Sequence, residues 1–64
     1  MEDWQMRVIE ERDQLKERFE KLDRFINADA LFSALPFPSR TLLIRQRYHM
    51  SCYLEVLTTR VDSW

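Results

Sequence analysis

Arginine and aromatic side chains at helical spacing are the residues of this chain best suited to binding chemistry. Five of them would form an anion site if the two ends of the chain meet: Trp4, Arg7, Arg12, Tyr53 and Arg60. A guanidinium binds phosphate or carboxylate through two parallel hydrogen bonds, and an aromatic face stacks on a nucleobase. Trp64 would form a further wall of this site. The alternative interpretation is structural, because arginines in an apolar seam often pack their stems and extend their charged groups into solvent.

A second group of cations follows the two prolines in the middle of the chain. Arg40 and Arg47 are seven residues apart, so they share one helical face, whereas Arg45 points elsewhere. The beginning of a helix also carries partial positive charge and free amides. The stretch therefore predicts a secondary anion site at Arg40 and Arg47, with an ordinary solvated face as the alternative.

The groups that catalysis and metal binding require are scarce. His49 is the only histidine and Cys52 the only cysteine, and neither CxxC nor HExxH spacing occurs. The chain has no glycine, so it lacks the glycine-rich loops that cradle phosphates and the turns that present a nucleophile. Cys52 has no adjacent cation that would favour a thiolate. The sequence predicts no catalytic residues, no metal, no cofactor and no enzymatic activity.

The charge balance limits the classes of partner. Ten basic and eleven acidic residues leave a net charge of -1, so no global field attracts nucleic acid or an acidic membrane. The longest aliphatic run, residues 42–44, is far shorter than the roughly 20 apolar residues of a membrane span. The acidic N-terminus does not resemble a signal peptide, and a lone cysteine fits a reducing compartment. We expect a cytoplasmic protein without a membrane partner and with little tendency to bind nucleic acid.

Two long helices account for the apolar pattern. The first, at about residues 3–26, has a seam of Trp4, Val8, Arg12, Leu15, Phe19, Leu22 and Ile26. The second, at about residues 40–62, has a seam of Leu43, Gln46, Met50, Tyr53, Leu57, Arg60 and Trp64, with Ser39 as its expected N-cap. The corner at residues 27–39 holds a short helical turn, capped by Asn27 or Asp29 and ended by the proline pair. The predicted fold is all-α, a single domain over residues 1–64 built as an antiparallel two-helix hairpin.

A hairpin of 64 residues has little core, and chains of this size usually need a disulfide, a metal or association. The apolar residues outside the two seams would leave a patch in water: Met6, Ile9 and Phe25 on the first helix, and Ile44, Tyr48, Cys52 and Leu54 on the second. We therefore expect the hairpin to assemble into a homo-oligomeric helical bundle. Three of them, Ile44, Tyr48 and Cys52, are also the candidate surface for a partner protein.

Two stretches, WQMRVIEERDQLKERFEKLDRFI and LLIRQRYHMSCYLEVLTTRV, resemble a family of short phage-encoded helical-hairpin proteins, related to a small protein of crAss-like phages. The positions that carry the resemblance are Trp4, Arg7, Val8, Lys21, Leu22, Phe25, Ile26, Leu42, Leu43, Gln46, Met50, Tyr53, Leu57 and Arg60. The corner LPFPS departs from the acidic turn that is usual in the family.

The resemblance implies a phage accessory protein that counters host defence in the bacterial cytoplasm. One route is a homo-oligomer that binds and sequesters a nucleotide second messenger of the immune response. The alternative is a non-enzymatic inhibitor that blocks a host defence protein by direct contact. A structural role in the virion is a third route, and it would require a larger polymer or a dedicated partner.

Overall fold

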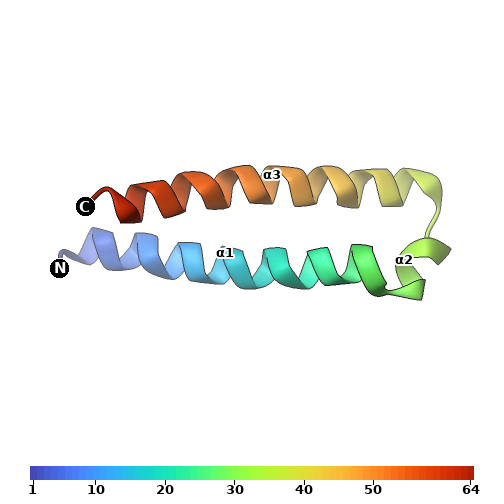
Figure 1. Cartoon of the computed structure of the whole chain (residues 1–64), viewed down its shortest axis with the longest axis horizontal. Coiled ribbons are helices and arrows are strands. Elements are labelled where there is room, and N and C mark those ends of the chain that lie inside the picture. Colours follow the sequence, from blue (N-terminus) through green and yellow to red (C-terminus); the bar gives the residue numbers. More distant parts are fainter.

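The computed structural model describes the whole chain, residues 1–64, as three helices (Figure 1). Helix α1 spans Asp3–Ala28, α2 spans Ala30–Ala34 and α3 spans Phe37–Asp62. The two long helices run antiparallel, with α2 at the corner and both termini at the opposite end, in a body of 46 × 15 × 14 Å. The predicted all-α hairpin is therefore confirmed. None of the helices combines the length and the apolar composition that crossing a bilayer requires.

The corner is built by one aspartate and two prolines. Asp29 ends α1 and caps α2, because its carboxylate accepts a hydrogen bond of 2.8 Å from the Leu31 amide. Asn27, the other predicted cap, belongs to the last turn of α1. Phe32 of α2 packs edge to face on Phe25, with 5.9 Å between ring centroids. The short turn therefore covers the closed end of the hairpin, as predicted.

Helix α3 begins three residues earlier than predicted, and Ser39 is not its N-cap. Pro36 occupies the cap position, and its carbonyl accepts from the Arg40 amide at 3.1 Å. Pro38 then lies within the first turn, where its fixed φ suits a helix and its missing amide hydrogen is not needed. The second proline thus begins the helix rather than breaking the chain before it.

Helix α1 faces its partner with the predicted seam. Val8 is buried, and the inward positions that follow are half-buried: Arg12, Leu15, Phe19, Leu22 and Ile26. Trp4 is the exception at the open end, where it remains partly exposed. The heptad-like spacing of this helix was sufficient to identify its inner face because no second apolar stripe competes with it.

The sequence predicted the wrong inner face for α3. Gln46, Tyr53 and Arg60 are exposed, and Arg47, Leu54 and Val61 occupy the inner positions beside Leu43, Met50 and the fully buried Leu57. Each of these residues directly follows the one that was predicted. The inner face of α3 is therefore rotated about the helix axis by less than the angle between consecutive residues. Burying Leu54 and Val61 instead of Tyr53 and Arg60 removes more apolar surface from water and leaves an arginine head in solvent.

Arg47 is accepted on the inner face because a polar partner lies opposite it. Its Nη1 donates to Asp23 Oδ1 and to Asn27 Oδ1, both at 3.1 Å, and Asn27 Nδ2 donates to Asp23 Oδ1 at 3.2 Å. At the other end of the hairpin, the Trp4 and Trp64 rings meet edge to face with centroids 5.2 Å apart. These contacts define the antiparallel register of the two long helices at both ends.

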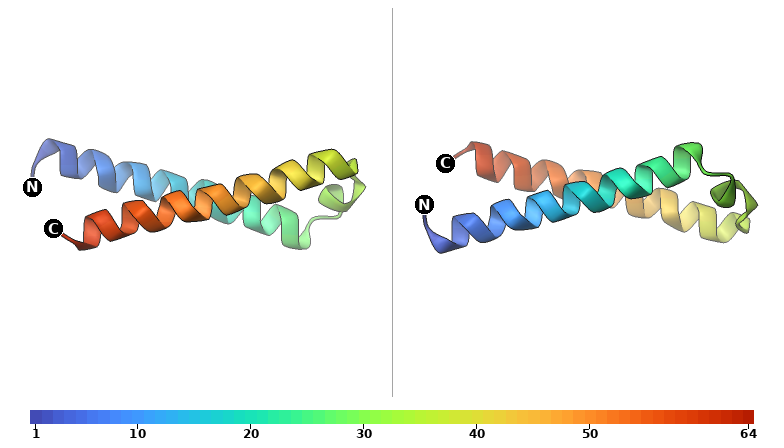
Figure 2. Two further views of the ribbon diagram at one scale, coloured as in Figure 1. Left: turned by 90° about the horizontal axis from the view of Figure 1, so that it is seen from above. Right: turned by 90° about the horizontal axis from the view of Figure 1, so that it is seen from below.

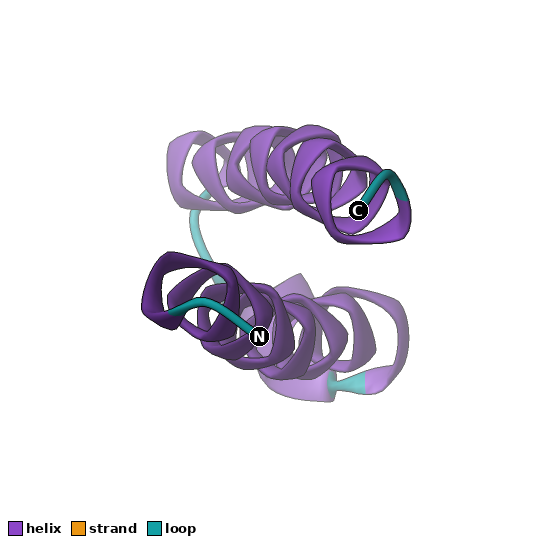
Figure 3. Ribbon diagram, turned by 90° about the vertical axis from the view of Figure 1, so that its left-hand side faces the viewer, coloured by secondary structure: helices purple, strands orange, loops and turns teal.

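The hairpin buries very little. Val8 and Leu57 are the only buried residues, and the accessible surface of 5006 Å² exceeds the roughly 4400 Å² typical of a monomer of 7.9 kDa. The radius of gyration is 14.4 Å, compared with about 11 Å for a compact domain of this length. Figure 2 shows the long helices crossing at a shallow angle, and the end-on view in Figure 3 shows only two layers, with both outer sides uncovered.

Candidate functional site

Aromatic and basic side chains gather on one side of the hairpin, toward its open end. The Trp4–Trp64 contact and a hydrogen bond from the Tyr53 hydroxyl to the Glu11 carboxylate place the two helices together there. On α1, Arg7 lies four residues before Glu11 and Arg18 lies seven residues after it, so both share the side of Glu11. On α3, Arg60 lies seven residues after Tyr53 and shares its side. We call this surface the aromatic–basic face; its residues are Trp4, Arg7, Glu11, Arg18, Tyr53, Arg60 and Trp64.

The charge of this face differs from that of the whole chain. Its three arginines have no acidic partner within 4 Å. The ion pairs of the structure involve other residues: Arg12–Asp13, Glu17–Lys21 and Asp23–Arg47. Asp3, although four residues before Arg7, does not pair with it. Glu11 lies at the centre of the face and Asp3, four residues before Arg7, at its end, so three positive charges oppose two negative charges. The face therefore attracts anions although the chain as a whole carries a charge of -1.

The aromatic rings of this face are available to a ligand. Trp4, Tyr53 and Trp64 are 49%, 46% and 43% exposed, which is high for large rings. The three hollows of the structure lie elsewhere, so the face is an open platform rather than a cavity. An open surface with free guanidinium groups and ring faces suits stacking of a flat group with phosphate contacts beside it.

Four of the five residues that the sequence predicts as ligand-binding share the aromatic–basic face, and Arg12 does not. Arg12 lies on the inner stripe four residues after Val8, and its guanidinium contacts the Asp13 carboxylate at 3.2 Å. It borders a hollow on the other side of the seam with Lys16, Leu54 and Thr58. Arg12 therefore cannot act on the same ligand as Trp4, Arg7, Tyr53 and Arg60 within one chain.

Glu11 is the residue of this face that sequence reasoning missed as a site residue. The sequence places Glu11 four residues after Arg7, and this spacing could have indicated a shared face. The same spacing is, however, typical of acids that only make a helix soluble. Only the observed rotation of α3, which turns Tyr53 outward beside Glu11, identifies it.

The arginines of the predicted secondary anion site contact other residues of the chain. The Arg47 guanidinium is committed to Asp23 and Asn27. Arg40 lies over the Phe37 ring, with its guanidinium carbon 5.8 Å from the ring centroid, and its Nε has no hydrogen-bond partner. An anion at this place would have Arg40 alone as an uncommitted cation.

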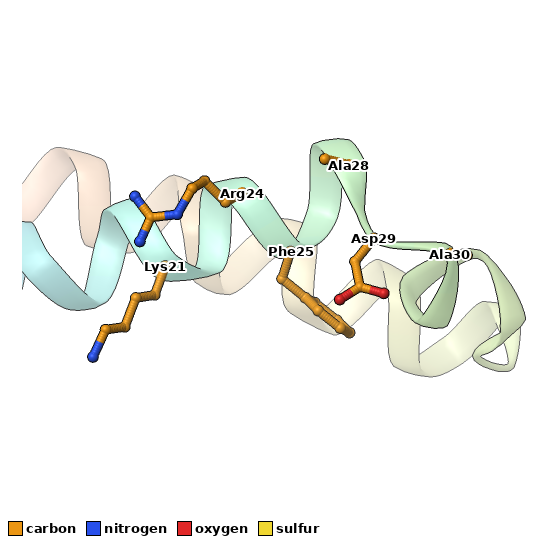
Figure 4. A pocket seen from close by; sticks show the side chains of 6 residues that line it. All are labelled: Lys21, Arg24, Phe25, Ala28, Asp29 and Ala30. Carbon is orange, nitrogen blue, oxygen red and sulfur yellow. The ribbon is translucent and has the colours of Figure 1, made fainter.

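A shallow hollow of about 400 Å³ lies at the closed end, lined by Lys21, Arg24, Phe25, Ala28, Asp29 and Ala30. Figure 4 shows the Lys21 and Arg24 side chains extending away from Asp29. Lys21 is paired with Glu17 at 3.1 Å, and Asp29 serves as the cap of α2. The polar groups here do not converge on a common point, so we assign no site to this hollow. No three His, Cys, Asp or Glu side chains come together as metal ligands either.

The predicted partner surface is present as an exposed patch on α3. Ile44 and Tyr48 are 45% and 64% exposed, and Cys52 is a free, exposed thiol one turn further along. A side-chain hydrogen bond with Cys52, followed by the charge of that neighbour and weak desolvation, raises the pKa of the Tyr48 phenol above its ordinary value. A phenol is uncharged at neutral pH even with its ordinary pKa, so this rise does not change the charge of the patch.

Comparison with protein families gives a match over nearly the whole chain. The family model Sequestin matches residues 2–63, which include both long helices and the corner between them. No curated protein and no solved structure shows significant similarity to the chain. The family name denotes sequestration, a binding role rather than catalysis. Because the match extends over nearly the whole sequence, the chain belongs to the Sequestin family.

Proposed function

We propose that the protein is a phage anti-defence accessory protein that sequesters a nucleotide-derived immune signal in the host bacterial cytoplasm, acting as a homo-oligomer. The observation that carries the proposal is the pair of unpaired guanidinium groups, Arg7 and Arg60, beside the exposed Trp4 and Trp64 rings on one face. The Sequestin match and the resemblance to phage-encoded hairpins support the same role.

The roles of the residues follow from their chemistry. Arg7 and Arg60 would bind phosphate oxygens, and Trp4 or Trp64 would stack on the base. A base stack contributes about 1–3 kcal/mol and a charge-assisted hydrogen bond about 1.5–3 kcal/mol. At the upper end of these ranges, one stack and two arginine contacts reach the roughly 8 kcal/mol that corresponds to a Kd of about 1 μM. The ligand should therefore carry at least one base and one phosphate.

Native mass spectrometry of the purified protein tests the proposal. The protein is measured alone and after incubation with a nucleotide extract from cells whose defence has been activated. We expect each chain to gain one nucleotide-sized mass, because each chain has one aromatic–basic face. An extract from cells without the defence system is the control and should give a much smaller gain. Equal spectra before and after incubation with the activated extract would contradict the proposal.

A second candidate function is direct inhibition of a host defence protein. The exposed patch of Ile44, Tyr48 and Cys52 favours it, because an apolar patch on a small protein often marks a protein contact. This function would need no small-molecule ligand, so a protein that gains no mass but retains a host protein on a pull-down would support it.

A further inference from the structure

Ile44 and Tyr48 border a groove between α1 and α3 on the side of the hairpin opposite the aromatic–basic face. The groove has a volume of about 340 Å³, and Phe19, Asp23, Arg47 and Ser51 complete its lining. Cys52 lies at its edge, four residues after Tyr48. We call this surface the Tyr48 face; its residues are Phe19, Ile44, Tyr48, Ser51 and Cys52.

The two sides of the hairpin differ in charge. On the Tyr48 face, the groove contains one acid and one base, Asp23 and Arg47, which neutralise each other at 3.1 Å. Tyr48 adds no charge, because a phenol is neutral at physiological pH. The aromatic–basic face instead carries three unpaired arginines, and two such faces would repel each other. Contact between identical copies is therefore favoured on the Tyr48 face.

The large exposed surface of the chain favours such a contact. Only Val8 and Leu57 are buried, and the accessible surface exceeds that of a typical monomer of this mass by several hundred Å². A stable interface buries about 800 Å² on each partner. One side of a body 46 Å long and 15 Å wide offers an area of this order. A copy that covers the whole Tyr48 side supplies the core that the single hairpin lacks.

We propose that a second copy of the chain packs on the Tyr48 face to form a dimer with its two-fold axis near Tyr48. An isologous interface places the same patch on itself. Residues 44–52 lie near the middle of α3 and Phe19 near the middle of α1, so an axis there aligns the copies over their full length. The paired α3 helices run antiparallel, and the two aromatic–basic faces remain on the outside, one on each chain. The dimer does not depend on what those outer faces bind.

Sedimentation analysis of the full chain at several concentrations tests the interface. We expect the wild-type protein to sediment with twice the chain mass of 7.9 kDa. The Tyr48→Glu substitution places a charge in the apolar contact and is expected to raise the dimer dissociation constant about 100-fold or more. Leu42→Glu is the matched control, since Leu42 is 61% exposed on α3 and lies six residues before Tyr48, about a third of a turn around the helix, and it should dimerise normally.

Because Tyr48→Glu could simply unfold, chemical crosslinking of the unmutated protein provides a second test. With antiparallel helices and an axis at Tyr48, the two Cys52 residues lie about 12 Å apart along the helix direction. A short bismaleimide should join them, whereas a Cys52→Ser, Val56→Cys variant, with thiols about 24 Å apart, should crosslink poorly. Three results would overturn the proposal: a monomeric wild-type protein, equal dissociation of both glutamate variants, or equal crosslinking at positions 52 and 56. A monomer would leave the Tyr48 face free for a host protein.

Discussion

Replacing Arg60 with alanine is expected to lower the affinity for a nucleotide ligand about 10- to 150-fold, with no change in helix content or oligomer mass. A charge-assisted hydrogen bond to phosphate contributes about 1.5–3 kcal/mol, which corresponds to this range. Arg60 is exposed and has no acidic partner, so its removal leaves no unpaired buried charge. Both tryptophans of the chain lie on the aromatic–basic face, so intrinsic fluorescence measures the binding directly.

Arg24→Ala is the matched control for this experiment. Arg24 is also an exposed arginine without an acidic partner, but it borders the hollow at the closed end rather than the aromatic–basic face. Its removal should leave the affinity unchanged. If Arg24→Ala weakens binding as much as Arg60→Ala does, the ligand senses only the overall charge. If Arg60→Ala unfolds the protein, Arg60 has a structural role instead.

Replacing Leu57 with alanine should unfold most of the protein at 25 °C. Leu57 is the only fully buried side chain, at 0% exposure. A buried Leu→Ala change costs about 2–5 kcal/mol, and the core of a chain below about 70 residues supplies no more than about 3–5 kcal/mol. Urea denaturation followed by circular dichroism measures the free energy of unfolding at a fixed protein concentration, because association contributes to the apparent stability.

The control for the Leu57 substitution is Val56→Ala. Val56 precedes Leu57 but is 55% exposed, so its truncation should change the free energy of unfolding by about 0.5 kcal/mol or less. Similar losses in the two variants would show that the observed rotation of α3 is wrong, since the seam would then include both positions.

The difference between the two helices explains how much of the fold could be predicted. Helix α1 has one apolar stripe, and its spacing defines the inner face that the structure shows. Helix α3 has two adjacent stripes, one through Tyr53 and Arg60 and one through Leu54 and Val61. Burial of Leu54 and Val61 favours the second stripe, but that rotation also turns Arg47 inward, and Asp23 and Asn27 of the other helix satisfy it there. A pattern within α3 alone does not contain that information.

The same rotation determines how much of the site could be predicted. The antiparallel register brings Trp4 to Trp64, as expected from the helix lengths. The outward turn of Tyr53 and Arg60 adds them to the face of Trp4 and Arg7 and brings Glu11 into it, whereas Arg12 remains on the inner stripe. The sequence placed the start of α3 too late because Pro38 is compatible with both the end of the corner and the first turn of a helix.

The most direct test of sequestration is to recover the ligand. The protein is saturated with the nucleotide extract, separated from unbound molecules, and denatured by heat, and the released molecules are measured by mass spectrometry and by their ability to activate the defence effector. We predict that the signal returns with unchanged mass and full activity, one molecule per chain. Release of a chemically altered product, or of no nucleotide at all, would contradict the account.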